Sequence, residues 1–309
     1  MLKVENITFA YNKKSKDAPV LSNIDFTVAK GEHISIIGES GSGKSTLLKL
    51  IYGEYDLDQG HIFWKDTEVL GPKYNLVVGY DFMKYVAQEF DLMPFITVAE
   101  NIGKHLSNFF PEEKKVRVQE LLDVVELTDF ANTKVKTLSG GQKQRVALAR
   151  ALAKQPEIIL LDEPFSHIDN FQKQSLRRSV FNYLKEKNIA CIVATHDSED
   201  VMGYADRMIV LHDSTIIANK SPQELYKNPE MPLTASFFGE FNLIDDQIIY
   251  AHQLQIVENS ELRVTVTRNY FKGHYYLIEA HTDDDIIFFE NQTALEKNSK
   301  VFLRVLKRQ

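Results

Sequence analysis

A glycine-rich segment around residue 40 has the residue types and the spacing of a phosphate-binding loop. An apolar run over residues 33–37, typical of a strand buried on both faces, precedes it, and Leu47, Leu50 and Ile51 follow at helical spacing. Glycines between a strand and a helix let backbone N–H groups curl around phosphates, and the helix N-terminus adds partial positive charge. The segment consists of Gly38, Glu39, Ser40, Gly41, Ser42, Gly43, Lys44, Ser45 and Thr46.

Two side chains of this loop can complete a triphosphate site. In the pattern G-x-x-x-x-G-K-[ST] the lysine, here Lys44, reaches the β- and γ-phosphates, and the hydroxyl, here of Ser45, ligates Mg²⁺. A glycine-rich turn that fits the pattern by chance is the alternative. The strand before the loop and the helix after it argue against that alternative.

An acidic pair follows an apolar run in the second half of the chain. Residues 158–161 are predicted to form a buried, parallel-type strand that delivers Asp162 and Glu163 to its end, where ligands sit in open α/β sheets. Asp162 suits a Mg²⁺ ligand acting through water, and Glu163 suits a group that orients or deprotonates an attacking water. Taken alone, adjacent carboxylates on a turn are usually just solvated.

Two further ring-bearing residues occupy positions next to predicted strands. His196 follows a strand over residues 189–195 and can hydrogen-bond a phosphate oxygen, although a capping histidine is an equal alternative. Tyr11 ends the first strand and could stack on a nucleotide base. Position alone favours a plain sheet aromatic at Tyr11.

A second glycine-rich element, Leu138-Ser139-Gly140-Gly141-Gln142, precedes a helix predicted over residues 143–153. Glycines and a serine at a helix N-terminus make another anion-binding surface. The alternative is a C-cap turn, which would place the glycines at the end of a helix rather than before one.

Other patterns supply the elements around these motifs. Thr97 and Glu100 have capping-box spacing, and Val118, Leu121 and Leu122 form one stripe of an amphipathic helix. The predicted helices cover residues 112–126 and 172–186, and further strands are predicted over residues 2–11, 208–212 and 215–218.

Composition limits the class of protein. The chain has 309 residues, of which 44% are hydrophobic and 26% charged, as in a soluble globular protein of one large or two ordinary domains. No apolar run approaches the roughly 18 residues that span a bilayer, and the start of the chain lacks a signal-peptide core, which predicts a cytoplasmic protein. The net charge of −7 argues against sequence-independent nucleic-acid binding. Cys191 is the only cysteine and is predicted to be a small core residue.

The last part of the chain changes character. Pro222, Pro229 and Pro232 punctuate residues 219–241, which read as a linker with two short helices, and helical periodicity then disappears. The roughly seventy residues that follow carry enough short strands for a small OB-type barrel. The predicted strands cover residues 247–250, 254–257, 262–267, 274–280, 285–290 and 300–306.

Taken together, these motifs resemble the ATP-binding subunit of an ABC transporter over residues 1–240. The phosphate loop, Gln88 at the glutamine loop, the intact LSGGQ signature at 138–142, the strand ending in Asp162 and a D-loop at 166–169 follow the family order. The resemblance implies an α/β fold: a P-loop NTPase ABC ATPase domain with a helical subdomain at about 89–155. A weaker resemblance of residues 241–309 to a transport-associated domain implies a small all-β OB-like barrel domain.

The resemblance also assigns roles to residues. Tyr11 corresponds to the adenine-stacking aromatic, Glu163 to the catalytic carboxylate and His196 to the switch histidine. Lys44 and Gln88 complete the group of catalytic residues. The resemblance assigns Mg²⁺ binding to Ser45, Gln88 and Asp162. It assigns ATP binding to Tyr11, residues 38–46 and, from a second subunit, Ser139, Gly140, Gly141 and Gln142.

By the same resemblance, the chain is the ATPase of a solute importer. It would work as a homodimer with integral-membrane permease subunits and a substrate-binding protein, at the cytoplasmic face of the membrane. An exporter or a lipid- or lipoprotein-extraction system is the rival with the same fold. A soluble ABC ATPase acting on ribosomes or DNA is disfavoured by the missing heptads and the acidic balance.

The segment after Gln88 is the predicted contact with the permease. Phe90, Leu92, Met93 and Phe95 form either internal packing or an apolar patch that awaits a partner. The resemblance favours a groove that takes a short coupling helix.

Three residues depart from the family pattern. His167 replaces a small residue of the D-loop, and Ser214 and Lys220 stand where turn glycines are common.

Overall fold

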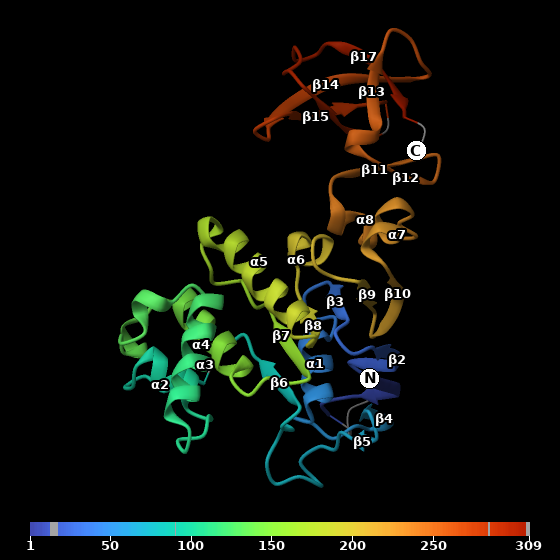
Figure 1. The fold of residues 1–309 in the computed structure, drawn as a ribbon. Helices are drawn as coiled ribbons and strands as arrows, with labels where there is room; N and C mark the ends of the chain where they lie inside the picture. The colour runs from blue at the N-terminus through green and yellow to red at the C-terminus, as the bar shows by residue number, and fades with distance from the viewer. Residues whose placement is uncertain (13–17, 90, 284, 307–309) are drawn as a thin grey trace. The chain divides into compact units, whose positions relative to one another are not determined.

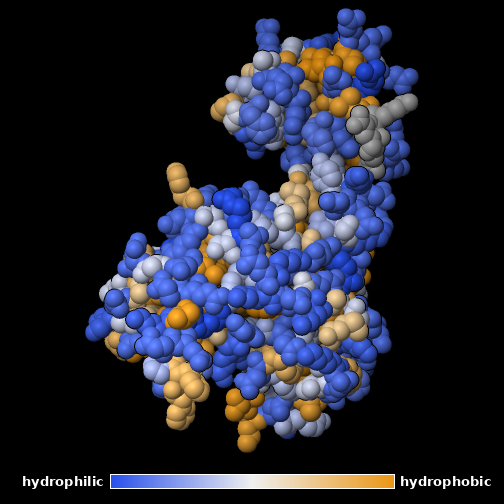
Figure 2. All heavy atoms as spheres, in the orientation of Figure 1, coloured by the Kyte–Doolittle hydropathy of each residue, from blue (hydrophilic) through white to orange (hydrophobic). Residues whose placement is uncertain are grey.

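The computed structural model describes residues 1–12, 18–89, 91–283 and 285–306. It divides into two compact units, Met1–Pro222 and Gln223–Gln309. The predicted domain boundary at residue 240 stays a prediction, and the predicted hairpin loop over residues 12–18 lies largely outside the described residues. Most of the surface drawn in Figure 2 is hydrophilic, and the large apolar side chains gather inside each unit.

A six-stranded sheet forms the centre of the first unit (Figure 1). Its order is β10-β9-β3-β8-β7-β6, parallel from β9 to β6, with β10 antiparallel at the edge. The strands are β3 (His33–Gly38), β6 (Met83–Val86), β7 (Ile158–Asp162), β8 (Ala190–Ala194), β9 (Arg207–His212) and β10 (Thr215–Lys220). The strands predicted at 33–37 and 158–161 are confirmed.

Both faces of this sheet are covered, which explains the continuous apolar runs. Along β7, Ile158 and Leu160 enter one buried cluster, whereas Ile159 and Leu161 enter another on the opposite face. Cys191 of β8 is fully buried, as predicted, and its burial raises the pKa of the thiol.

One face packs against helix α1 (Lys44–Tyr52) and a four-stranded antiparallel sheet of order β2-β1-β4-β5. Trp64, at the end of β4, is a packing residue in this cluster. The strands are β1 (Leu2–Phe9), β2 (Leu21–Val28), β4 (Gln59–Trp64) and β5 (Thr67–Glu68).

The other face packs against helices. Thr97 caps α2 with Glu100 in the predicted capping box, and Val118, Leu121 and Leu122 of α3 are buried as predicted. The elements are α2 (Val98–Gly103), α3 (Pro111–Val124), η1 (Thr128–Phe130), η2 (Val135–Thr137), α4 (Gly140–Leu152), α5 (Asn170–Glu186) and α6 (Ser198–Met202).

Two helix starts were predicted too late. Helix α4 begins at Gly140, not at residue 143, because Ser139 caps it and Gln142 lies in its first turn. Helix α5 begins at Asn170, directly after its N-cap Asp169.

The turn between β9 and β10 contains Ser214, which stands where a turn glycine is common. Asp213 and Ser214 both adopt left-handed backbone conformations, with φ of 44° and 67°. The Ser214 hydroxyl donates a hydrogen bond of 2.6 Å to the Pro19 carbonyl. That contact offsets part of the conformational cost of a non-glycine residue there.

Two short helices, α7 (Pro222–Lys227) and α8 (Pro232–Phe238), lie at the start of the second unit, and β-strands form most of the rest of it. The hairpin β11–β12 precedes an antiparallel sheet of order β13-β17-β14-β15-β16, packed around a separate apolar cluster. The OB-like barrel stays a prediction. The strands are β11 (Phe241–Ile244), β12 (Gln247–Tyr250), β13 (Leu254–Val257), β14 (Leu262–Phe271), β15 (Tyr276–His281), β16 (Ile286–Asn291) and β17 (Lys300–Val305).

Across the described ranges, none of the helices combines the length and the apolar character that a membrane span requires.

Candidate active site

A cavity of about 490 Å³ lies where loops leave the carboxyl ends of the parallel strands. The phosphate loop follows β3, Gln88 follows β6, the acidic pair ends β7 and His196 follows β8. All of the lining residues except Val20 were predicted site residues. They are Tyr11, Val20, Ser40, Gly41, Gly43, Lys44, Ser45, Thr46, Gln88, Asp162, Glu163 and His196.

The phosphate loop has the backbone that its glycines allow. Gly41 and Gly43 have φ of 85° and 98°, in the left-handed region that favours glycine, and a Cβ on Gly43 would lie 2.9 Å from Leu21 Cδ2. Lys44 Nζ donates to the carbonyls of Gly38, at 2.8 Å, and Glu39, at 2.9 Å. The loop therefore holds its lysine in the cavity.

Charge and burial act on Lys44 in opposite directions. Partial burial lowers the pKa of its ammonium group, while the carboxylates of Glu163 and Asp162 oppose the shift. A cation so placed is available to neutralise phosphate oxygens.

Asp162 and Ser45 form an oxygen-rich edge of the cavity. Ser45 Oγ donates to Asp162 Oδ1 at 3.0 Å, and the hydroxyl of Tyr85 donates to Asp162 Oδ2 at 3.1 Å. Burial and the adjacent carboxylate raise the pKa of Tyr85, so its hydroxyl stays protonated and remains a donor. Hydroxyl and carboxylate oxygens are the ligands that Mg²⁺ prefers.

Glu163 has an unusual backbone for a charged residue. Its φ of 50° lies in the left-handed region, and such strain clusters at functional sites. Its carbonyl accepts hydrogen bonds from Gln144 Nε2, at 2.8 Å, and Ser166 Oγ, at 3.0 Å, while its N–H donates to the Ala194 carbonyl at 2.9 Å. The backbone is thus held on both sides.

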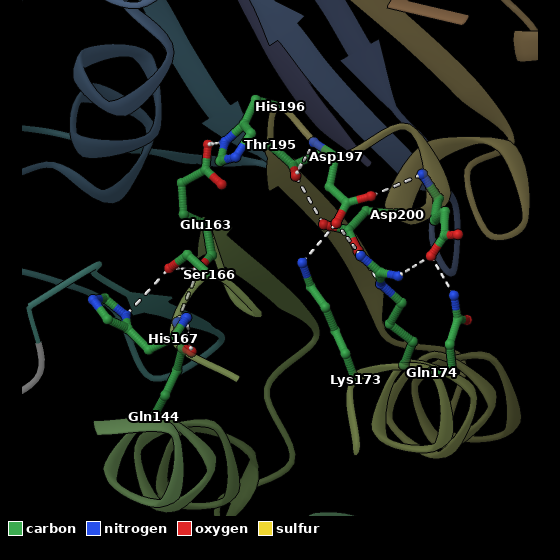
Figure 3. Close-up of polar contacts among 12 residues, drawn as sticks. Gln144, Glu163, Ser166, His167, Lys173, Gln174, Thr195, His196, Asp197 and Asp200 are labelled. Carbon is green, nitrogen blue, oxygen red and sulfur yellow. Dashed lines mark hydrogen bonds and ion pairs between the residues drawn. The ribbon is translucent and has the colours of Figure 1, made fainter. Parts of the chain in front are cut away.

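His196 contacts the carboxylate of Glu163 directly. The distance from Nδ1 to Glu163 Oε1 is 2.8 Å, and Figure 3 shows the two side chains turned toward each other. The side chain of His196 is 74% exposed, so its other nitrogen is accessible from the cavity. The capping alternative for His196 is wrong, because the N-cap of α6 is Asp197.

Tyr11 lies at the rim of the cavity with its ring 59% exposed. Its hydroxyl is 2.8 Å from Thr46 Oγ1, and the ring meets Phe9 and Tyr55 edge-on. This placement leaves ring surface open beside the phosphate loop, and base stacking stays a prediction.

The signature residues are not brought to this cavity. Ser139 and Gln142 form a capping box at the start of α4, in which Gln142 N–H donates to Ser139 Oγ at 3.2 Å and Ser139 N–H donates to Gln142 Oε1 at 2.9 Å. Neither they nor Gly140 and Gly141 line the cavity within the chain. Three loop residues, Gly38, Glu39 and Ser42, also lie outside its lining.

Like Tyr85, Gln144 is a site neighbour that the motifs did not single out. It is buried on α4, where it binds the carbonyl of Glu163 and accepts a hydrogen bond of 3.2 Å from the N–H of His167. A Cβ on Gly141 would lie 2.7 Å from the His167 carbonyl, so α4 packs closely on the D-loop. The only available signal was a glutamine two residues beyond the signature.

These features together define a nucleoside-triphosphate site of the P-loop class: a glycine-rich loop with a lysine, an oxygen-lined edge and a carboxylate beside a histidine.

Comparison with known proteins gives the family. The model of the ABC transporter family matches residues 21–166. An Fe(3+) ions import ATP-binding protein, FbpC 2 of Haemophilus influenzae, is 36% identical over 253 residues, covering 80% of this chain and 70% of the relative. The sulfate/thiosulfate import ATP-binding protein CysA of Synechococcus elongatus is 38% identical, covering 72% of this chain and 64% of the relative.

A solved structure agrees with this grouping. The dimeric, post-hydrolysis ATP-binding cassette MJ0796, bound to ADP and Pi, has 31% sequence identity and a TM-score of 0.64, covering 72% of this chain and 98% of that one. The chain belongs to the ATP-binding subunits of the ABC transporter family, and it is an ATPase.

Proposed function

We propose that this chain binds Mg²⁺-ATP in the cavity beside the phosphate loop and hydrolyses it to drive solute import through a membrane partner. The 2.8 Å contact between Glu163 and His196, opposite Lys44, carries the proposal. It supports the proposal because a carboxylate that can act as a base and its histidine partner line the same cavity as Lys44.

The residues present fit a magnesium ion. Ser45 and Asp162 would hold it, with Gln88 at the same cavity, and the ion would supply charge neutralisation at the phosphates. The Ser45 hydroxyl and the Asp162 carboxylate are hard oxygen donors of the kind that Mg²⁺ prefers, and the Tyr85 hydroxyl holds Asp162 through a hydrogen bond.

The chain's own groups account for phosphate binding and for activation of the attacking water. Lys44 exchanges its backbone carbonyl contacts for phosphate oxygens, and backbone N–H groups of the loop bind the same phosphates. Glu163 orients the attacking water and accepts its proton. His196 holds the Glu163 carboxylate in place through one ring N–H and, when its second nitrogen also carries a proton, donates to a phosphate oxygen.

The signature residues lie outside the chain's own cavity, which supports a dimer. Ser139 caps α4, a helix of 13 residues, and the two glycines are its first residues, yet they line no part of the chain's own cavity. We infer that they close the cavity of a second copy, so that a twofold homodimer encloses two ATP molecules. ATP then favours the closed dimer and hydrolysis releases it.

Docking on a permease at the cytoplasmic face of the membrane is supported by a surface next to Gln88. A groove of about 480 Å³ is lined by Glu89, Asp91, Lys104, Arg150 and other residues of this region. Phe95 lies 73% exposed near the same segment. The importer reading agrees with the iron and sulfate import proteins among the relatives. A substrate-binding protein on the far side of the membrane completes the proposed system.

Glu163→Gln tests the proposal. The amide keeps the size of the side chain but cannot accept the proton, so we expect ATP binding to persist while kcat falls about a thousandfold. ATP should then hold the variant as a dimer, which size-exclusion chromatography with light scattering detects. Turnover close to that of the parent protein would refute the role of Glu163.

A matched variant, Glu157→Gln, changes a partly exposed carboxylate just before β7 that pairs with Lys65. It should leave turnover unchanged and shows whether any loss in Glu163→Gln is local to the site.

A further inference from the structure

A buried arginine outside the cavity organises the loop that carries His196. Arg177, on α5, is 1% exposed, and its guanidinium meets three carboxylates. Nε donates to Asp200 at 2.5 Å, Nη1 donates to Glu199 at 2.5 Å, and Nη2 donates to Asp197. Lys173, one turn earlier on α5, donates to Asp197 at 2.7 Å. Among the ion pairs of the described residues, no other element supplies this loop with two cations.

The carboxylates that Arg177 holds are those that fix the turn around His196. The buried Thr195 hydroxyl donates to Asp200 Oδ2 at 2.8 Å and accepts from the N–H of Asp197 at 3.0 Å. His196 stands between these two anchored residues. Its orientation therefore depends on contacts that lead back to α5.

Figure 3 shows the two directions of this turn. His196 faces Glu163, whereas Asp197 points toward Lys173 on α5. The turn thus lies between the catalytic carboxylate and the ion pairs.

The charges favour a fixed arrangement. Burial opposes the charge of Arg177, but Asp200 and Asp197 outweigh it and the pKa of the guanidinium is raised. Asp200 is itself 2% exposed, and a buried carboxylate is strongly destabilised without its cation. The planar fork of an arginine serves several carboxylates at once, which a lysine cannot do.

We propose that Arg177 is a positioning residue for hydrolysis: it clamps the turn 195–197 so that His196 stays hydrogen-bonded to Glu163. This proposal rests on the proposed function, because it assigns Arg177 no contact with ATP and acts only through His196. It also links the D-loop to the histidine, since Asp169 of the D-loop is the N-cap of α5.

The test is a double-mutant cycle on the full-length chain, with Arg177→Lys and His196→Ala alone and combined. Arg177→Lys keeps the charge but loses the fork, so we expect kcat to fall roughly 10- to 100-fold, as misplacement of a reacting group does, with KM for ATP unchanged. In the His196→Ala background the same change should lower kcat no further, because the residue through which it acts is gone.

The control is Arg117→Lys. Arg117 is a second arginine with a mostly covered side chain, 11% exposed, and it donates hydrogen bonds of 2.6 and 3.1 Å to the carbonyls of Leu152 and Ala153, but it touches no part of the turn. It should lower thermal stability while leaving kcat close to that of the parent.

The outcomes separate the two proposals. Equal losses of kcat from Arg177→Lys with and without His196, or a rise in KM instead of a fall in kcat, would overturn the positioning role alone. Unchanged hydrolysis in His196→Ala would overturn the proposed function of the histidine first. If Arg177→Lys does not fold, Thr195→Val removes the hydroxyl that joins the turn to Asp200 and takes its place in the same cycle, with the same expectations.

Discussion

Glu163 and Gln144 show how much of the site lies in contacts between backbone and side chain. The left-handed φ of Glu163 costs about 1 kcal/mol or more, and four hydrogen bonds to its backbone hold the residue there. The amide of Gln144 joins that backbone to the D-loop. The orientation of the Glu163 carboxylate is therefore set by groups that do not take part in the reaction.

A buried histidine on β3 predicts part of the pH dependence of stability. Burial, with the charge of Lys185, lowers the pKa of His33 to about 4. The unfolded chain, with a histidine pKa of about 6.5, binds its proton first as the pH falls. The free energy of unfolding should therefore drop by about 3 kcal/mol between pH 6.5 and pH 4, and this contribution is fully present above pH 6.5.

Urea unfolding of the parent and of His33→Gln at several pH values measures this contribution. The difference between the two curves should be flat above pH 6.5 and should change steadily below it. A difference that does not vary with pH would show that His33 titrates normally in the folded protein.

The sequence motifs and the family resemblance together named every residue that lines the cavity except Val20, with Gln88 and the site role of Tyr11 coming from the resemblance. That success has a physical reason: phosphate, Mg²⁺ and the attacking water each demand particular donors at the ends of particular strands. Gln144 was not predicted as a site neighbour because no sequence pattern marks a single glutamine on a helix. Its role depends on packing against residues 163 and 167, and only the folded chain brings these together.

At the scale of elements, two helices begin with the same device. Thr97 with Glu100 caps α2, and Ser139 with Gln142 caps α4, each through reciprocal hydrogen bonds. In our proposal only the second helix start meets ATP. Comparing the two helix starts therefore separates the contribution of a cap to stability from the contribution of the signature residues to ATP hydrolysis.

Ser139→Ala and Thr97→Ala should each lose about 1 kcal/mol of stability, seen as a melting temperature lower by roughly 2–4 °C. Only Ser139→Ala should also lower ATP hydrolysis and ATP-dependent dimerisation. Calorimetry and a phosphate-release assay on both variants provide the comparison. Equal hydrolysis in the two would place the signature away from the nucleotide.

In the second unit, apolar residues mark the strands that were predicted, and the strand with a buried polar residue was missed. Strands β12 and β13 were predicted with their bounds, because apolar residues mark both. Strand β11 was missed. Its Asn242 is buried and bonds to both the carbonyl and the N–H of Phe288, at 2.8 and 2.7 Å, so an amide occupies a core position.

At the scale of the whole molecule, the surface after Gln88 is the proposed contact with the permease. Phe90 lies outside the described residues. Leu92 packs against the helical cluster, whereas Met93 and Phe95 are exposed. The two alternatives for this segment thus apply to different side chains: Leu92 belongs to internal packing and Phe95 to the proposed contact.

Phe95→Asp should leave the subunit folded, with its ATPase intact, yet prevent it from co-purifying with the membrane partner. Leu92→Asp is the contrasting variant and should lower the melting temperature, because it puts a charge against the core. Loss of stability in Phe95→Asp, or normal assembly, would move the docking surface elsewhere.

The two units should fold separately, since each has its own apolar cluster. A chain that ends at Pro222 should remain soluble and bind ATP with the affinity of the full chain. Residues 223–309 alone should unfold in one cooperative transition. Isothermal titration and circular dichroism measure both, and an insoluble first unit would contradict the division.

The position of β3 in the central sheet also constrains the order in which the protein can form during synthesis. Residues 33–38 pair with β8 and β9, which the ribosome makes more than 150 residues later. At about 5–20 residues per second, an apolar strand with its phosphate loop therefore waits roughly 10–30 s for its neighbours. Nascent chains released before β8 should expose that strand to chaperones, and nucleotide affinity should appear only once both late strands have emerged.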